Sequence, residues 1–495
     1  MESVDTQTRG QALDCLAHHW YHGPLRAYLT FDVSFPLLLH SNESPLPCRE
    51  TARELAAASA HFSAQIGALF DVLKELQGPL KQTTRILKDG RVHEEGLELT
   101  IRIQRQSFDR YLDCYHRTYH SRHVVLYNSA SLPSLSSVVK LRIESVPNYG
   151  AEVHFASVRS ISPRVPLDIL AHLPCIREID CPWLWERPPI AFQALPMRHY
   201  TRPWEGPWRD SRHAFARAAH QLDGYLPSSL VKARLWFWKP STFNDDQSVQ
   251  MPNLIHPALA DPISVGIRAI APGLEELNVR AFLTPDLFDA ETPWLRMKRL
   301  RVEFHPLRPD GSWYFVGPRG ENPNPEGFEI QHEHYPPAIC SPEDEEMDDL
   351  WIENEEGYEE DTRLPDAFRT EPLSDNIEPL LLAFATALTK MPSLKEAELF
   401  AYVEWNPSES RKAEYADDMP YEEYSIHRWG VKYISAAGDS KALVEWQVGT
   451  WRPQENIVKL FEALSGDDEV IVLWKPFDFL RSRDPGDISA DKYSW

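Results

Sequence analysis

Apolar residues along this chain follow two periods, one typical of helices and one typical of strands. The clearest helical stripe has apolar residues at i, i+3, i+4, i+7 and i+11, and its members are Ile377, Leu380, Leu381, Phe384 and Leu388. Met391-Pro392 ends this helix, because proline disfavours helical geometry for the residue before it. Leu394, Ala397 and Leu399 then follow an L-x-x-L-x-L-like spacing, and Leu399, Ala401 and Val403 take the period of two of a strand. Residues 376–402 therefore predict one unit of helix, proline stop and strand.

This order of elements recurs along the chain after residue 132. Further strands are expected from their apolar spacing at residues 176–181, 231–238, 274–279, 300–304 and 470–474. Successive units of strand, helix and parallel strand connect right-handedly, so repetition coils them into a solenoid. We predict an α/β fold, an irregular leucine-rich-repeat-like solenoid or horseshoe over residues 131–495. The strand positions between the apolar ones would line its concave face.

The N-terminal region, residues 1–130, is predicted to be mainly helical. Thr51 and Glu54 have the spacing of a capping box and begin a long helix near residues 51–77. Residues 97–103 alternate apolar and polar side chains, as in a strand with one wet face.

Residues 306–375 do not fit the repeat. They are rich in proline and glycine at first and then dense in acids from Glu343 to Asp361, which predicts a flexible, disordered acidic insertion. Trp351 and Tyr358 inside the acidic run are the side chains that would anchor it to a basic partner.

Charge and composition narrow the possible functions. The formal net charge is −23 with a pI of about 5.3, which argues against general affinity for nucleic acid or an anionic membrane. No stretch reaches the roughly 18 apolar residues of a membrane helix, and Met1–Asp5 lack the start of a signal peptide. We expect a cytoplasmic or nuclear protein. The six cysteines have no C-x-x-C spacing, and Cys175 and Cys181 are expected to be small buried thiols.

The motifs of common enzymes are absent from the sequence. It contains no G-x-S-x-G, Gly-rich phosphate loop, H-E-x-x-H or dinucleotide fingerprint, so we expect no catalytic residues and no cofactor. Four residues superficially resemble a metal cluster, namely Cys114, His116, His120 and His123. Nothing in the spacing fixes their orientation, and a solvated polar face is favoured over a metal site. An alternative function is an enzyme or small-ligand site near His305, covered by the acidic loop, with His332 and His334 nearby.

The outward strand positions are the better candidates for a binding site. They are Asp180, Arg234, Trp236, Trp238, Asn278, Arg280, Arg301, Glu303, His305, Tyr402 and Glu404. A row of exposed aromatic and arginine side chains is typical of a protein interface. The alternative is that the chain's own loops cover the tryptophans.

Several short phrases resemble one protein family. They are G-L-E-L-T-I-R-I at 96–103, L-P-S-L at 132–135, L-P-C-I-R-E-I at 173–179, A-P-G-L-E-E-L at 271–277, W-L-R-M-K-R-L-R-V-E-F-H-P at 294–306 and G-S-W-Y-F at 311–315. Together they resemble the filamentous-fungal F-box-like proteins with degenerate leucine-rich repeats. The resemblance implies a substrate-recognition adaptor of an SCF-type ubiquitin ligase, in which an N-terminal F-box binds Skp1 and the repeats hold an unknown substrate.

The F-box itself is missing or degenerate here. An L-P-x-E start is absent, and Phe35-Pro36-Leu37-Leu38-Leu39 is the nearest apolar run. We therefore expect a non-enzymatic protein–protein interaction module with protein partners, Skp1 among them. A further alternative is a scaffold that recruits a basic partner through its acidic loop.

Overall fold

The chain divides into two compact units in the computed structural model. Unit 1 comprises Met1–Pro189, Pro196–Trp236 and Tyr335–Gly357, and unit 2 comprises Ile190–Leu195, Phe237–His334 and Tyr358–Trp495. The structure describes residues 21–22, 27–39, 46–47, 49–76, 84–86, 92–94, 96–107, 120–145, 159–182, 184, 186–187, 195–200, 202–222, 224–238, 246–289, 293–353, 365–416, 418–438, 440–466, 469–476 and 478–480.

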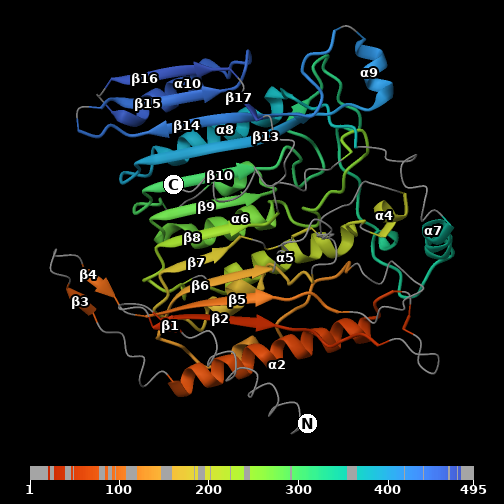
Figure 1. Ribbon diagram of the computed structural model, residues 1–495. Helices are drawn as coiled ribbons and strands as arrows, with labels where there is room; N and C mark the ends of the chain where they lie inside the picture. Colours follow the sequence, from red (N-terminus) through yellow and green to blue (C-terminus); the bar gives the residue numbers. More distant parts are fainter. Residues whose placement is uncertain are drawn as a thin grey trace. The chain divides into compact units, whose positions relative to one another are not determined.

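Unit 1 is built on a mainly parallel sheet with the strand order β1-β2-β5-β6-β7-β8 (Figure 1). Its strands are β1 (Tyr21–His22), β2 (Ala27–Val33), β5 (Leu97–Ile103), β6 (Val138–Ser145), β7 (Glu178–Cys181) and β8 (Lys232–Trp236). A separate hairpin pairs β3 (Thr84–Ile86) with β4 (Val92–Glu94). The helices are α2 (Ala52–Leu76), η2 (Ser129–Ser131), α3 (Val165–Leu170), α4 (Leu195–Tyr200), α5 (Glu205–Gln221) and α7 (Pro342–Glu353). Within the described part of this sheet β1 and β2 pair antiparallel, and β2, β5, β6, β7 and β8 pair parallel in that order.

The long helix expected near residues 51–77 is α2. Thr51 and Glu54 form the capping box, since the Glu54 N–H donates to Thr51 Oγ1 at 3.2 Å and the Thr51 N–H donates to Glu54 Oε2 at 2.7 Å. Its apolar stripe is buried, with Phe62, Ile66 and Leu69 in the core. None of the helices among the described residues is both long enough and apolar enough to cross a membrane.

Unit 2 contains a mixed sheet with the strand order β9-β10-β13-β14-β15-β16, and β17 also pairs with β14. Its strands are β9 (Glu276–Ala281), β10 (Arg299–Phe304), β13 (Glu396–Trp405), β14 (Ser425–Ile434), β15 (Ala442–Gln447), β16 (Val470–Lys475) and β17 (Asp478–Leu480). A small hairpin joins β11 (Phe315–Val316) and β12 (Glu371–Pro372). The helices are α6 (Pro262–Ile270), η5 (Ala271–Gly273), η6 (Pro285–Leu287), η7 (His332–His334), α8 (Ser374–Leu388), α9 (Glu409–Tyr415), α10 (Glu455–Glu462) and η8 (Ala463–Ser465).

The predicted solenoid is wrong, although its local elements are present. The apolar stripe of α8 is buried, and β13 follows it. In a solenoid each coil adds a parallel strand, whereas β14 pairs antiparallel with both β13 and β15, and β17 pairs antiparallel with β14. The chain is instead an α/β protein whose mostly parallel sheet strands are interleaved with helices.

The predicted domain boundary between residues 130 and 131 lies inside unit 1. The strand β5 before it and the strand β6 after it pair directly, for example Leu99 with Leu141. The N-terminal region contributes strands to this sheet because the alternation in residues 27–33 and 97–103 buries one face of each strand.

Much of the segment predicted as a disordered insertion is folded. Residues 306–353 and 365–375 contain β11, η7, α7 and β12, while 354–364, with Tyr358, lie outside the described residues. Within unit 2 the fully buried Arg369 joins residues 365–375 to the earlier part of this segment. Its guanidinium donates to the Pro323 carbonyl at 2.6 Å and to Asn322 Oδ1 at 2.6 Å. The composition of the segment did not reveal that it folds, because the acceptors of Arg369 are a backbone carbonyl and an amide far away in the sequence.

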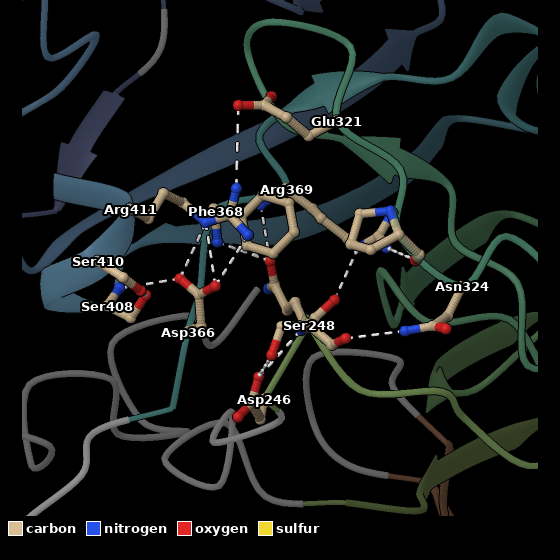
Figure 2. Close-up of polar contacts among 12 residues, drawn as sticks. Asp246, Ser248, Glu321, Asn324, Asp366, Phe368, Arg369, Ser408, Ser410 and Arg411 are labelled. Carbon is tan, nitrogen blue, oxygen red and sulfur yellow. Dashed lines mark hydrogen bonds and ion pairs between the residues drawn. The ribbon is translucent and has the colours of Figure 1, made fainter. Parts of the chain in front are cut away.

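A second arginine, Arg411, contacts the residues next to Arg369. Arg411, on α9, stacks over Phe368 at 3.4 Å from the ring centroid and donates to Asp366 at 3.0 Å. Figure 2 shows segments that are far apart in the sequence meeting around these side chains. Burial and the neighbouring Arg411 lower the pKa of Arg369 to about 10.

Candidate functional site

One face of the unit 1 sheet carries polar side chains in aligned rows; we call it the polar face of unit 1. On β5 the odd-numbered residues are buried and the even-numbered residues remain half-buried. Parallel pairing in register brings the half-buried positions of neighbouring strands side by side.

Three rows cross this face. The first row contains Tyr28, Glu98, Lys140, Glu178 and Lys232. The second row contains Thr30, Thr100, Arg142, Asp180 and Arg234. The third row contains Asp32, Arg102 and Glu144. Charged neighbours within every row alternate in sign, so the face is balanced in charge on a strongly acidic chain.

Ion pairs fix the side chains of these rows. Asp180 accepts from Arg234 at 2.5 Å and from Arg142 at 2.8 Å. Arg142 also pairs with Glu144 at 2.6 Å. Burial lowers the pKa of Arg142, but the two carboxylates outweigh burial and raise it. Arg142 and Arg234 keep about a third of their surface, 34% and 30%, in solvent. The rows thus form a preorganised polar surface that a partner can reach.

The equivalent face in unit 2 is more deeply buried; we call it the polar face of unit 2. Arg280 lies opposite Glu303 in the pairing of β9 with β10, and its Nε donates to Glu303 at 2.9 Å. Glu398 on β13 forms ion pairs with both Arg301 and Arg428. Both guanidinium groups also stack on the ring of Phe400, at 4.9 and 4.2 Å from its centroid.

An aromatic cluster lies at one end of the polar face of unit 2. The ring centroid of His305 is 4.2 Å from that of Phe282 and 5.3 Å from that of Trp238. His305 Nδ1 accepts from the Leu307 N–H at 3.0 Å, which fixes the ring. On β13, Glu404 is half-buried, and burial raises its pKa to about 7. A carboxyl group with this pKa can exchange a proton near neutral pH.

The structure divides the predicted binding residues between the two faces. Asp180, Arg234 and Trp236 belong to unit 1. The remaining predicted residues lie in unit 2 and are Trp238, Asn278, Arg280, Arg301, Glu303, His305, Tyr402 and Glu404. Trp236 and Trp238 are only 3% and 4% exposed, so they do not form an exposed aromatic row. Both tryptophans are buried within the protein, whereas the sequence had left open whether they are exposed or covered.

Sequence reasoning missed most of the polar face of unit 1. It noted the alternation at 97–103 but treated it as part of a separate domain, and it did not use residues 138–145, where Lys140, Arg142 and Glu144 alternate with apolar residues. The period-two pattern was the available signal. The pairing of Arg142 with Asp180 was not readable, since the two residues are distant in the sequence.

The histidine candidates do not form a metal site where the structure describes them. Of the four-residue cluster, Cys114 and His116 lie outside the described residues, while His120 is buried and contacts Arg159. His334 stacks on Phe328 at 4.7 Å, and His332 is exposed. No group of three or more potential ligands that could hold a metal ion occurs within the described ranges. The thiol of Cys181 is buried, which raises its pKa, and Cys175 is half-buried.

The acidic helix α7 is docked within unit 1 by its inner face. Asp344 accepts from Arg49 Nε at 2.7 Å and contacts His199 Nε2 at 2.7 Å. Tyr200 donates to Asp348 at 2.6 Å. These contacts hold the pKa of Asp344 well below its usual range, despite the opposing effect of burial. The inner acids of α7 are therefore used by unit 1 itself, and its outer acids, such as Glu345, are exposed.

No protein-family model and no curated protein matches the chain. The function is therefore inferred from the geometry of the two polar faces.

Proposed function

We propose that the chain is a non-enzymatic protein-binding module that holds its partner on the polar face of unit 1. The observation that carries this proposal is the set of aligned, sign-alternating rows fixed by ion pairs. Side chains that are already held in place lose little entropy on binding. Their alternating charges favour one docking register over its neighbours, because a shift by one strand brings like charges together.

The particular form implied by the family resemblance is an adaptor that binds Skp1 near its N-terminus and a substrate on this face. Such a protein would act in the cytoplasm or nucleus. The segment nearest to an F-box is the apolar run at residues 35–39, in which Leu37 and Leu39 are exposed. Binding of purified Skp1 to the intact chain and its loss in Leu37→Asp/Leu39→Asp would support the adaptor form. Absence of binding to the intact chain, or equal binding by the variant, would contradict it.

The docking face is tested with charge-reversal variants. Proteins captured from a fungal extract by the intact chain are purified and titrated against the Arg142→Glu/Arg234→Glu variant and against Lys390→Glu/Lys459→Glu, a matched double charge reversal at exposed positions of unit 2. We expect the double variant to bind at least about tenfold more weakly, with the control unchanged. Equal binding by the double variant would contradict the proposal.

A second candidate function is a small-ligand or catalytic site beside His305. It is supported by the aromatic cluster of Trp238, Phe282 and His305 together with Glu404, whose raised pKa suits proton exchange. A screen of small molecules by thermal unfolding tests it. Ligands of this site should stabilise the wild type but not Glu404→Gln, and stabilisation of both proteins would contradict the assignment.

A further inference from the structure

The strand β16 lies at the end of the strand order and is unusual for an edge strand. Its sequence from Val470 to Trp474 is V-I-V-L-W, without charge, proline or bulge. Ile471, Leu473 and Trp474 are 43%, 41% and 37% exposed. Among the described residues no strand pairs with its outer edge. Exposed apolar edges of this kind invite pairing with another strand, and proteins ordinarily protect them.

The neighbouring strand keeps β16 in place. β15 pairs with β16 over its whole length, from Ala442 with Val470 to Gln447 with Lys475. Trp474 stacks on Trp446 with ring centroids 5.3 Å apart, and the Arg452 guanidinium lies 4.2 Å from the Trp474 ring centroid. The edge is thus a formed strand whose outer backbone groups are positioned to accept a partner strand.

The sequence around β16 is complementary to itself when two copies run antiparallel. If Val472 lies opposite Val472 of a second copy, Ile471 lies opposite Leu473, and Val470 lies opposite Trp474. At both ends of this register Glu469 lies opposite Lys475. Directly opposed residues in an antiparallel pair share a face of the sheet, so apolar meets apolar and acid meets base throughout.

The charged ends are available for this pairing. Glu469 pairs with Lys441 at 2.6 Å and Lys475 pairs with Glu445 at 2.6 Å, and both side chains remain substantially exposed. Each carboxylate can accept from a second ammonium group, and each ammonium group can donate to a second carboxylate. A contact of this kind closes on itself after two copies, because the same strand contributes to both sides.

We propose that β16 is a dimerisation edge, at which two copies of the chain pair antiparallel about Val472 and join their sheets. The dimer would bury the exposed apolar residues of β16 and satisfy its outer backbone groups. It would leave the rows of the polar face of unit 1 intact within each copy.

Sedimentation of the purified full-length chain over a concentration series tests the proposal first. We expect a monomer–dimer equilibrium whose dissociation constant rises at least about tenfold in Val472→Lys, which opposes two ammonium groups at the centre. The matched control is Leu259→Lys, at a fully exposed position outside the strands, and it should leave the equilibrium unchanged. A chain that stays monomeric, or a dimer that survives Val472→Lys, overturns the proposal.

Charge exchange gives a second measurement that does not depend on the core of β16. Glu469→Lys and Lys475→Glu should each weaken the dimer, because like charges would then lie opposite. An equimolar mixture of the two single variants should form a heterodimer more tightly than either forms a homodimer, since every pair at the ends would again be opposite in charge. Absence of this preference would overturn the register.

Cysteine cross-linking measures the register directly. Opposed Cα atoms in an antiparallel pair lie about 5 Å apart, within disulfide range, so Val472→Cys should cross-link to itself under mild oxidation. Ile471→Cys would face Leu473 instead, with its own counterpart about 8 Å away, and should not cross-link. Preferential cross-linking of Ile471→Cys would overturn the proposed alignment.

Discussion

Arg280 and Glu303 lie opposite each other on β9 and β10, and their side chains form a buried ion pair with an Nε–Oε2 distance of 2.9 Å. Burial lowers the pKa of Arg280, and the carboxylate of Glu303 opposes that effect. Each charge of the pair therefore compensates the other, since either charge alone would be costly to bury.

We expect Glu303→Gln to destabilise the protein by about 3–5 kcal/mol, because Arg280 would lose this carboxylate while remaining buried. Urea unfolding measures the change. Replacing both partners by Met and Leu should recover most of the loss. Glu455→Gln, at an exposed ion pair on α10, is the control and should change little. A Glu303→Gln variant as stable as the control would refute this account.

Glu404 gives a prediction for pH dependence. Burial raises its pKa from 4.5 to about 7, so the folded state binds a proton that the unfolded state has released between those values. The contribution of Glu404 to stability should therefore fall as the pH rises from about 4.5 to 7, by about 1–3 kcal/mol after allowance for partial solvent exposure. Relative to the wild type, Glu404→Gln should gain this amount of stability between pH 5 and pH 8 in urea unfolding. An unchanged slope in the variant would count against it.

His427 on β14 acts in the opposite direction. Burial lowers its pKa from 6.5 to about 4, so the unfolded state binds more protons between these values. The stability present above pH 6.5 is lost as the pH falls towards 4, by up to about 3 kcal/mol. In the wild type the effects of Glu404 and His427 partly cancel. Unfolding of His427→Gln and Glu404→Gln between pH 4.5 and 6.5 should separate them, giving slopes of opposite sign.

Within unit 2, Arg369 ties residues 365–375 to residues 315–323. Arg369→Met should remove its bonds to Asn322 and Pro323 and leave the buried carbonyls of Phe315 and Gln247 without this donor, at a cost of about 2–4 kcal/mol. Hydrogen exchange should show the largest loss of protection at β11 and β12. The control is Arg319→Met, whose guanidinium bond to Glu414 is exposed. Equal protection in the two variants would show that Arg369 does not hold the segment.

The sequence by itself determined most of the local elements. The capping box of Thr51 and Glu54, the stripe of α8 and the alternation of β5 follow from contacts only a few residues apart, so period and spacing were sufficient to predict them. The same patterns also placed Arg280 and Glu303 among the outward positions of their two strands.

Only the tertiary structure decided how these elements assemble and which residues are accessible. The antiparallel pairing of β14 with β13 depends on how the chain turns between them. The spacing of apolar residues is the same in parallel and antiparallel strands, so it does not predict the direction of pairing. Arg142 and Asp180 meet because in-register parallel pairing joins strands far apart in the sequence. Folding of the proline-rich and acidic segment depends on distant partners, namely Arg369 for one part and Arg49 with His199 for α7. Such contacts are set by the whole chain, and local composition cannot reveal them.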